Sequence, residues 1–191
     1  YDILNSRGVN VVDATCPFVK KIHKIVDEHS RAGEAVIIIG SPVHPEVEGI
    51  RGWGNGDTVV VENEADAEDY NLPEGKKLCI VSQTTFNYNK FQELVEKISK
   101  KGYDSSVLNT ICNATQERQV EAARIASSVE AMIVIGGRHS SNTQKLYEIC
   151  LKECKNTFYI QTLGDLDPDS VSSVRSVGIT AGASTPKKII E

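Results

Sequence analysis

The chain has 191 residues, a formal net charge of −5 and 40% hydrophobic residues, which is enough for one large or two small folded domains. Its lysines and arginines are scattered singly, and no apolar stretch approaches the roughly 18 residues of a membrane span, so neither nucleic acid nor a membrane is an expected partner. Five cysteines without a close CxxC pair argue against a disulfide framework and a zinc ribbon, and we expect a cytoplasmic protein.

Short runs rich in Val and Ile alternate along the chain with amphipathic segments, which is typical of an α/β fold. The expected strands are residues 9–14, 35–39, 58–61, 78–81, 106–109, 131–135, 157–160 and 176–180. One expected helix begins at Pro17, with Phe18, Ile22 and Val26 on its apolar stripe. Another is marked by apolar residues between 91 and 98 and ends at Gly102. Each strand is expected to lead into a helix.

The spacing of particular residues predicts an internal repeat. Cys16 precedes Gly40 by 24 residues, and Cys112 precedes Gly136 by the same interval. Two units of about 96 residues therefore follow one another, each with a cysteine before its first helix.

We expect the repeat to form two tandem α/β/α domains, residues 17–108 and 109–191. A mainly parallel sheet in each, covered by helices on both faces, is the simplest packing of alternating strands and helices.

The loops that follow the expected strands are small and polar. In open α/β sheets, ligands bind beyond the carboxyl ends of the strands, where helix N-termini point unpaired N–H groups. Hydroxyl and amide side chains gather in these loops: Thr84, Thr85, Ser140, Ser141, Asn142 and Ser184. Capping the helices would require fewer than these six residues. Their hydroxyl and amide groups are the hydrogen-bond donors that a phosphate or diphosphate needs.

Two cysteines, Cys16 and Cys112, are expected at helix N-termini. There the positive end of the helix dipole favours the thiolate, the form that binds metals and attacks electrophiles. The alternative is a small buried apolar residue at each strand end. Cys79 lies inside an apolar strand, and Cys150 and Cys154 lie four residues apart on a helix, so we interpret these three as structural.

His44 and Glu46 lie on one strand-end loop and could supply a hydrogen-bond donor to an anion and a proton donor. A solvated surface pair is the alternative. His139, beside the hydroxyl cluster, is a minor candidate. Nucleotide-binding fingerprints are absent, because residues 136–139 lack the Walker A spacing and residues 52–56 are not GxGxxG.

Six motifs in register resemble the LytB-type 4-hydroxy-3-methylbut-2-enyl diphosphate reductases. They are DATCP at 13–17, HPEVEG at 44–49, SQTT at 82–85, NTICNAT at 109–115, SSN at 140–142 and TAGAS at 180–184. The resemblance implies an enzyme of the non-mevalonate isoprenoid pathway. It also implies three pseudo-equivalent α/β domains in a trefoil around a central [4Fe–4S] cluster, with one cysteine from each domain.

On that pattern Cys16 and Cys112 resemble two of the three cluster ligands. Glu46 resembles the proton source, and Thr84 resembles the hydroxyl that binds and orders the substrate alcohol. The residues that resemble the family's diphosphate-binding set are His44, Ser140, Ser141, Asn142 and Ser184.

The implied reaction removes the C4 hydroxyl of (E)-4-hydroxy-3-methylbut-2-enyl diphosphate as water and yields isopentenyl and dimethylallyl diphosphate. It uses electrons from a donor such as ferredoxin or flavodoxin. Residues 1–16 match the end of the family's first domain, which carries the third cluster cysteine. We therefore expect this chain alone to hold no intact cluster and to be inactive.

Two other functions fit the residues without the resemblance. A thiol-dependent transferase or hydrolase of a phosphorylated substrate would use Cys16 or Cys112 as nucleophile and His44 as base. A non-catalytic module that binds a phosphorylated metabolite would need neither cysteine. The cluster hypothesis requires both.

Overall fold

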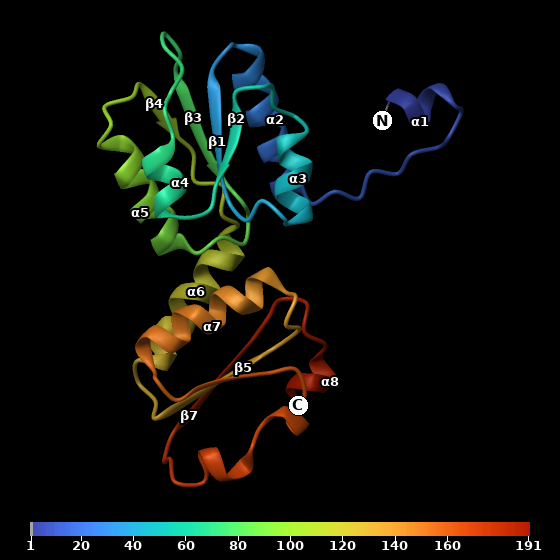
Figure 1. The fold of residues 1–191 in the computed structure, drawn as a ribbon. Helices are drawn as coiled ribbons and strands as arrows, with labels where there is room; N and C mark the ends of the chain where they lie inside the picture. The colour runs from blue at the N-terminus through green and yellow to red at the C-terminus, as the bar shows by residue number, and fades with distance from the viewer. Residues whose placement is uncertain (1) are drawn as a thin grey trace.

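Two separate parallel sheets organise the residues that the computed structural model describes, 2–191 (Figure 1). The first sheet has the order β2-β1-β3-β4 and consists of Ala35–Ile39 (β1), Thr58–Val61 (β2), Leu78–Ser82 (β3) and Ser105–Val107 (β4). The second has the order β6-β5-β7 and consists of Ala131–Ile135 (β5), Thr157–Ile160 (β6) and Val177–Ala181 (β7). Every strand pair is parallel, which confirms the predicted α/β class with parallel sheets.

Helices lie before, between and after the strands. They are Asp2–Ser6 (α1), Pro17–Arg31 (α2), Pro45–Arg51 (α3), Glu64–Asp69 (α4), Tyr88–Ser99 (α5), Asn113–Ala126 (α6), Ser141–Glu153 (α7) and Lys187–Ile190 (α8). Two 3-10 turns, Leu163–Asp165 (η1) and Pro168–Val171 (η2), follow β6. Between residues 2 and 191, none of the helices combines the length and apolar character that a bilayer crossing requires.

The first sheet is buried on both faces, as its continuous apolar strands predict. Val36 and Ile38 of β1 pack against α2 and α3, and Ile37 and Ile39 pack against α5 on the opposite face. All four side chains are inaccessible to solvent. Each such side chain contributes roughly 1.5–3 kcal/mol of burial free energy, which fixes β1 at the centre of the sheet.

The second sheet is covered by long helices on one face only, among the residues described. Met132 and Val134 of β5 pack against α6 and α7. On the other face, Ile133 and Ile135 contact Leu166, beside η1, instead of a long helix. The expectation of helices on both faces of each sheet is therefore correct for the first sheet and wrong for the second, because β6 and β7 lead only into short turns and α8.

Residues 9–14, expected to be a strand, form none. They run as an irregular, largely exposed segment between α1 and α2 (Figure 1). A strand needs a neighbour to pair its N–H and C=O groups, and none of the described strands pairs with this segment. The helix at Pro17 forms as expected, with Ile22 and Val26 buried, but Phe18 is 46% exposed and does not join the core.

Buried polar contacts join the two units. The Gln119 side chain of α6 accepts a hydrogen bond from the Tyr88 N–H (3.0 Å) and donates one to the Phe86 carbonyl (3.0 Å). The Cys112 N–H, at the start of the same helix, donates to the Thr84 carbonyl (3.0 Å). The segment after β3 is therefore attached to the first helix of the second unit.

Gly40, at the end of β1, offers a stability test. A Cβ there would lie 2.8 Å from Cγ2 of Val47 and 3.0 Å from Cβ of Gln83, both of which are buried. We expect Gly40→Ala to lower the free energy of unfolding by about 1–3 kcal/mol, measured by urea denaturation. Gly137→Ala is the control, because a Cβ at Gly137 meets no atom within 4 Å. Equal stability of the two variants would contradict the packing described.

Candidate active site

A cavity of about 380 Å³ lies between the two units, at the carboxyl ends of β1 and β3 and beside the start of α7. Its lining residues come from both units: Ser41, Val43, His44, Pro45, Glu62, Gln83, Phe86, His139, Ser141, Gln144 and Lys145. Strand-end loops from the two units thus meet at this cavity.

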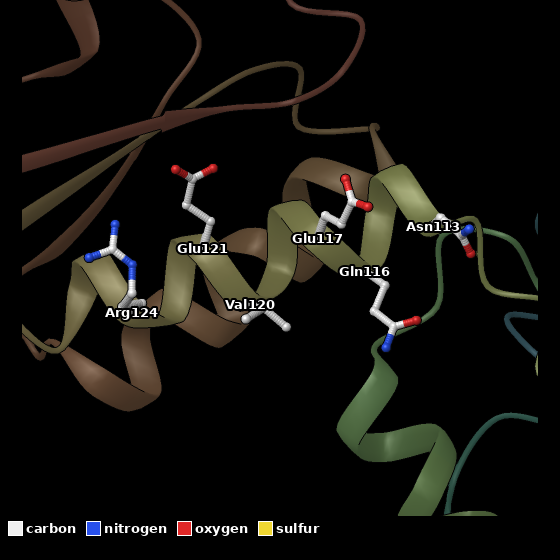
Figure 2. Close-up of a pocket in the computed structure, with 6 residues that line it drawn as sticks. All are labelled: Asn113, Gln116, Glu117, Val120, Glu121 and Arg124. Carbon is white, nitrogen blue, oxygen red and sulfur yellow. The ribbon is translucent and has the colours of Figure 1, made fainter.

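A larger hollow, of about 570 Å³, lies on the outer face of α6 (Figure 2). All six side chains that line it come from this one helix, including Glu117, Val120 and Arg124. None of the predicted site residues lines it. Two of the predicted site residues, His44 and Ser141, instead line the smaller cavity between the units.

Glu46 and Thr84, the two predicted catalytic residues, are in direct contact. Glu46 lies in the first turn of α3, and its Oε1 accepts a hydrogen bond from the Thr84 N–H at 2.6 Å. Its Oε2 accepts a second from the Thr84 hydroxyl at 2.8 Å. Thr84 is only 7% exposed and Glu46 is half-buried, so the carboxyl group and the hydroxyl form a shielded pair.

His44 is the N-cap of α3, directly before Pro45. Its Nδ1 accepts a hydrogen bond from the Glu46 N–H at 3.2 Å. Because a backbone N–H can only donate, Nδ1 is unprotonated in this arrangement and Nε2 carries the ring proton. His44 therefore presents a hydrogen-bond donor, and it lines the cavity.

Two of the predicted hydroxyl residues start α7. Ser140 is its N-cap, and its Oγ accepts hydrogen bonds from the N–H (3.3 Å) and the hydroxyl (3.0 Å) of Thr143. Capping thus accounts for Ser140. The Oγ of Ser141 instead lies 3.3 Å from Nε2 of Gln83 and 3.2 Å from Oγ1 of Thr85, across the boundary between the units.

Asn142 and Ser184 differ in their surroundings. Asn142 is 9% exposed, and within residues 2–191 its side-chain amide nitrogen has no hydrogen-bond partner. An unpaired buried donor costs about 1–3 kcal/mol, so Asn142 has a donor to offer to a bound group. Ser184 is exposed in the loop after β7 and does not line the cavity.

Cys16 and Cys112 are the N-cap residues of α2 and α6, as predicted, and neither side chain makes a capping hydrogen bond. Cys16 is exposed and Cys112 is half-buried. The other three cysteines are buried, as their structural interpretation requires. Burial raises the pKa of Cys79 to about 12 and that of Cys150 to about 11, so neither thiol ionises near neutral pH.

Thiolates at helix N-termini suit an iron–sulfur cluster by their donor chemistry. Within residues 2–191, however, the structure brings together no group of three or more His, Cys, Asp or Glu side chains that could hold a metal ion. Cys16 and Cys112 therefore fit as two ligands of a larger set, and their role as ligands stays a prediction.

Three residues with a place in the site were not assigned a role from the sequence: Gln83, Gln119 and Lys145. Gln83 and Lys145 line the cavity, and Gln119 fixes the loop beside it. A polar residue on the buried face of an expected helix was the feature of the sequence that could have identified Gln119. The roles of all three residues depend on contacts between distant segments, which the spacing of residues in the sequence does not reveal.

The LytB family model, described as "LytB protein", matches residues 1–191. This chain belongs to the LytB family. It is 48% identical over 191 residues to the 4-hydroxy-3-methylbut-2-enyl diphosphate reductase of Thermoanaerobacter sp. (strain X514) and 42% identical to that of Clostridioides difficile (strain 630). The LytB chain is covered completely in both alignments and spans 66% and 68% of the two relatives.

The fold also matches a solved structure of this family. The E-1-hydroxy-2-methyl-but-2-enyl-4-diphosphate reductase from Plasmodium falciparum superposes with a TM-score of 0.92 and 31% sequence identity. The match covers 98% of the LytB chain and 60% of the Plasmodium chain. It supports the two-sheet arrangement as the arrangement of the family.

The exposure of the cysteines predicts which thiols of the LytB chain react. We expect iodoacetamide to modify Cys16 and Cys112 in the native chain, because only these two of the five are not buried, and to modify Cys79, Cys150 and Cys154 only after unfolding. Mass spectrometry of the labelled peptides, with and without denaturant, makes the comparison. Rapid native labelling of Cys79 or Cys150 would show that the core is not packed as described.

Proposed function

We propose that this LytB chain supplies the diphosphate-binding and proton-donating residues of a 4-hydroxy-3-methylbut-2-enyl diphosphate reductase. The observation that carries the proposal is the Glu46–Thr84 pair beside a cavity lined by hydrogen-bond donors. The reaction converts (E)-4-hydroxy-3-methylbut-2-enyl diphosphate to isopentenyl and dimethylallyl diphosphate. It consumes two electrons and two protons, breaks the C4–O bond and releases the oxygen as water.

Two of the residues proposed to bind the diphosphate end of the substrate, His44 and Ser141, line the cavity. A diphosphate accepts hydrogen bonds and carries several negative charges, so its recognition requires N–H and O–H groups. His44 offers its Nε2–H, Asn142 offers its unpaired amide, and the hydroxyls of Ser140, Ser141 and Ser184 complete the proposed set. The N-terminus of α7 adds unpaired backbone N–H groups on the same side.

The alcohol end of the substrate is proposed to meet Thr84. Its hydroxyl donates to Glu46, so its lone pairs remain available to accept a hydrogen bond from the substrate alcohol. When Glu46 is protonated, both directions reverse: Glu46 donates to Oγ1 of Thr84, and the Thr84 hydroxyl donates its own proton to the leaving oxygen. The shielded position of the pair keeps bulk water from competing with this transfer.

Cys16 and Cys112 are proposed to hold a [4Fe–4S] cluster together with a third cysteine from a preceding α/β domain. When bound, such a cluster supplies the two electrons and a Lewis-acidic iron. We propose residues 17–108 and 109–191 as the second and third domains of a trefoil, with 1–16 as the end of the first. Ferredoxin or flavodoxin is the proposed class of electron donor.

The thiol-nucleophile alternative requires a base beside a thiol. In the part of the chain that the structure describes, His44 forms no hydrogen bond with Cys16 or Cys112. No observation favours this alternative.

A chimera tests the proposed function. In it, this chain replaces the matching 66% of the Thermoanaerobacter reductase, and the chimera is prepared anaerobically. We expect stoichiometric iron and sulfide, and conversion of (E)-4-hydroxy-3-methylbut-2-enyl diphosphate to the two products. A folded chimera with a full cluster that leaves the substrate unchanged would contradict the proposal.

Glu46→Gln in that chimera separates proton delivery from binding. The amide keeps the shape and can still hydrogen-bond to Thr84, but it has no transferable proton. We expect turnover to fall by roughly two to four orders of magnitude with little change in KM and in cluster content. Glu48→Gln is the control, since Glu48 is an exposed residue of the same helix. Turnover of the Glu46 variant close to that of the control would exclude Glu46 as the proton source.

A further inference from the structure

Gln83 lies at the centre of the polar contacts between the two units, although it has no role in the function proposed above. It directly follows β3 and is 1% exposed. Its Oε1 accepts a hydrogen bond from the Ser41 N–H at 3.1 Å. Its Nε2 donates to the hydroxyls of Thr85 at 3.0 Å and Ser141 at 3.3 Å. One side chain thus joins three of the loops around the cavity.

The orientation of this amide follows from the chemistry of its partners. The Ser41 backbone N–H can only donate, so the atom of Gln83 that faces it must be the oxygen. Both protons of Nε2 therefore point at the two hydroxyl oxygens. Gly40 leaves room for this arrangement, because a Cβ there would lie 3.1 Å from Oε1 of Gln83.

The amide in turn determines the direction of the two hydroxyls. Oγ of Ser141 and Oγ1 of Thr85 each accept from Gln83, and they lie 3.2 Å apart, so one of them donates to the other. Two hydroxyl protons are present and this contact uses one. When Thr85 is the donor, the remaining proton is that of Ser141, which lines the cavity and can donate it to a group bound there.

We propose that Gln83 is a positioning residue that orients the Ser141 and Thr85 hydroxyls so that the cavity presents a donor to an oxyanion. The proposal deepens the proposed function, on which it rests. A side chain that accepted hydrogen bonds at this position would turn both hydroxyl protons inward and present oxygen lone pairs to the ligand. The site would then repel a diphosphate.

The second unit lacks this device. Gly182 directly follows β7, as Gln83 directly follows β3. A Cβ at Gly182 would lie 2.1 Å from Oγ1 of Thr143, so no side chain fits there. A glutamine at this position is therefore specific to the first unit and is not a general requirement of the repeated fold.

The orientation is tested first in the free chain, by NMR of the Gln83 side-chain amide. We expect Ser141→Ala to shift one of the two amide proton signals and Thr85→Val to shift the other, while the Ser41 N–H signal stays in place. If neither variant moves either amide proton signal, Gln83 does not hold the two hydroxyls and the proposal is wrong. This arm needs no ligand and no substitution of Gln83.

The consequence for binding is tested with inorganic diphosphate, by calorimetry on the same chain. Gln83→Glu replaces the donor by an acceptor, and we expect the Kd to rise about ten- to hundredfold near neutral pH. Gln144→Glu is the charge control, since exposed Gln144 lines the same cavity without contacting Ser141. As the pH falls toward about 4.3, the carboxyl group introduced by Gln83→Glu becomes protonated and regains one hydrogen-bond donor. The ratio of the Kd of Gln83→Glu to that of Gln144→Glu should therefore approach one.

Equal weakening by both variants at every pH would show a charge effect alone and overturn the proposal. Failure of the wild-type chain to bind diphosphate, with the NMR pattern as expected, would instead contradict the proposed function and leave the orienting role of Gln83 in place. Thermal unfolding followed by circular dichroism verifies that each variant is folded.

Discussion

Residues 82–88, the last residue of β3 and the loop after it, form hydrogen bonds with parts of both units around the site. Its partners in order along the segment are Thr110, Ser141, Glu46 and Gln119, from the connection after β4, from α7, from α3 and from α6. Buried backbone and side-chain polar groups must find such partners, because each one left unpaired costs about 1–3 kcal/mol. Meeting this requirement fixes the relative position of the two units.

The same contacts arrange the proposed chemistry. The carboxyl group of Glu46 meets Thr84 because α3 starts immediately after the loop that ends β1, and β1 is the neighbour of β3. Ser141 reaches the cavity because α7 starts at the corresponding place in the second unit. The parallel sheets thus bring helix N-termini and strand ends together, and the residues in the loops decide what binds there.

The sequence predicted the features that depend on neighbouring residues. The apolar run of residues 35–39 forms a fully buried strand, and Cys16 and Cys112 cap helices at matching places in the repeat. The strand expected at residues 9–14 did not form, because apolar composition favours a strand only where another strand can pair with it. The role of Gln83 could not be predicted, since its contact with Ser141 joins positions 58 residues apart.

Native-state hydrogen exchange measures most directly whether residues 82–88 hold the two units in their relative position. Backbone N–H groups of Ser82, Thr84, Tyr88 and Cys112 donate to partners in or around the segment. We expect these four amides to exchange as slowly as those of β1 and β5, because their opening requires the units to separate. Exchange as fast as that of exposed loop amides would contradict this expectation, since the segment would then open without disturbing either sheet.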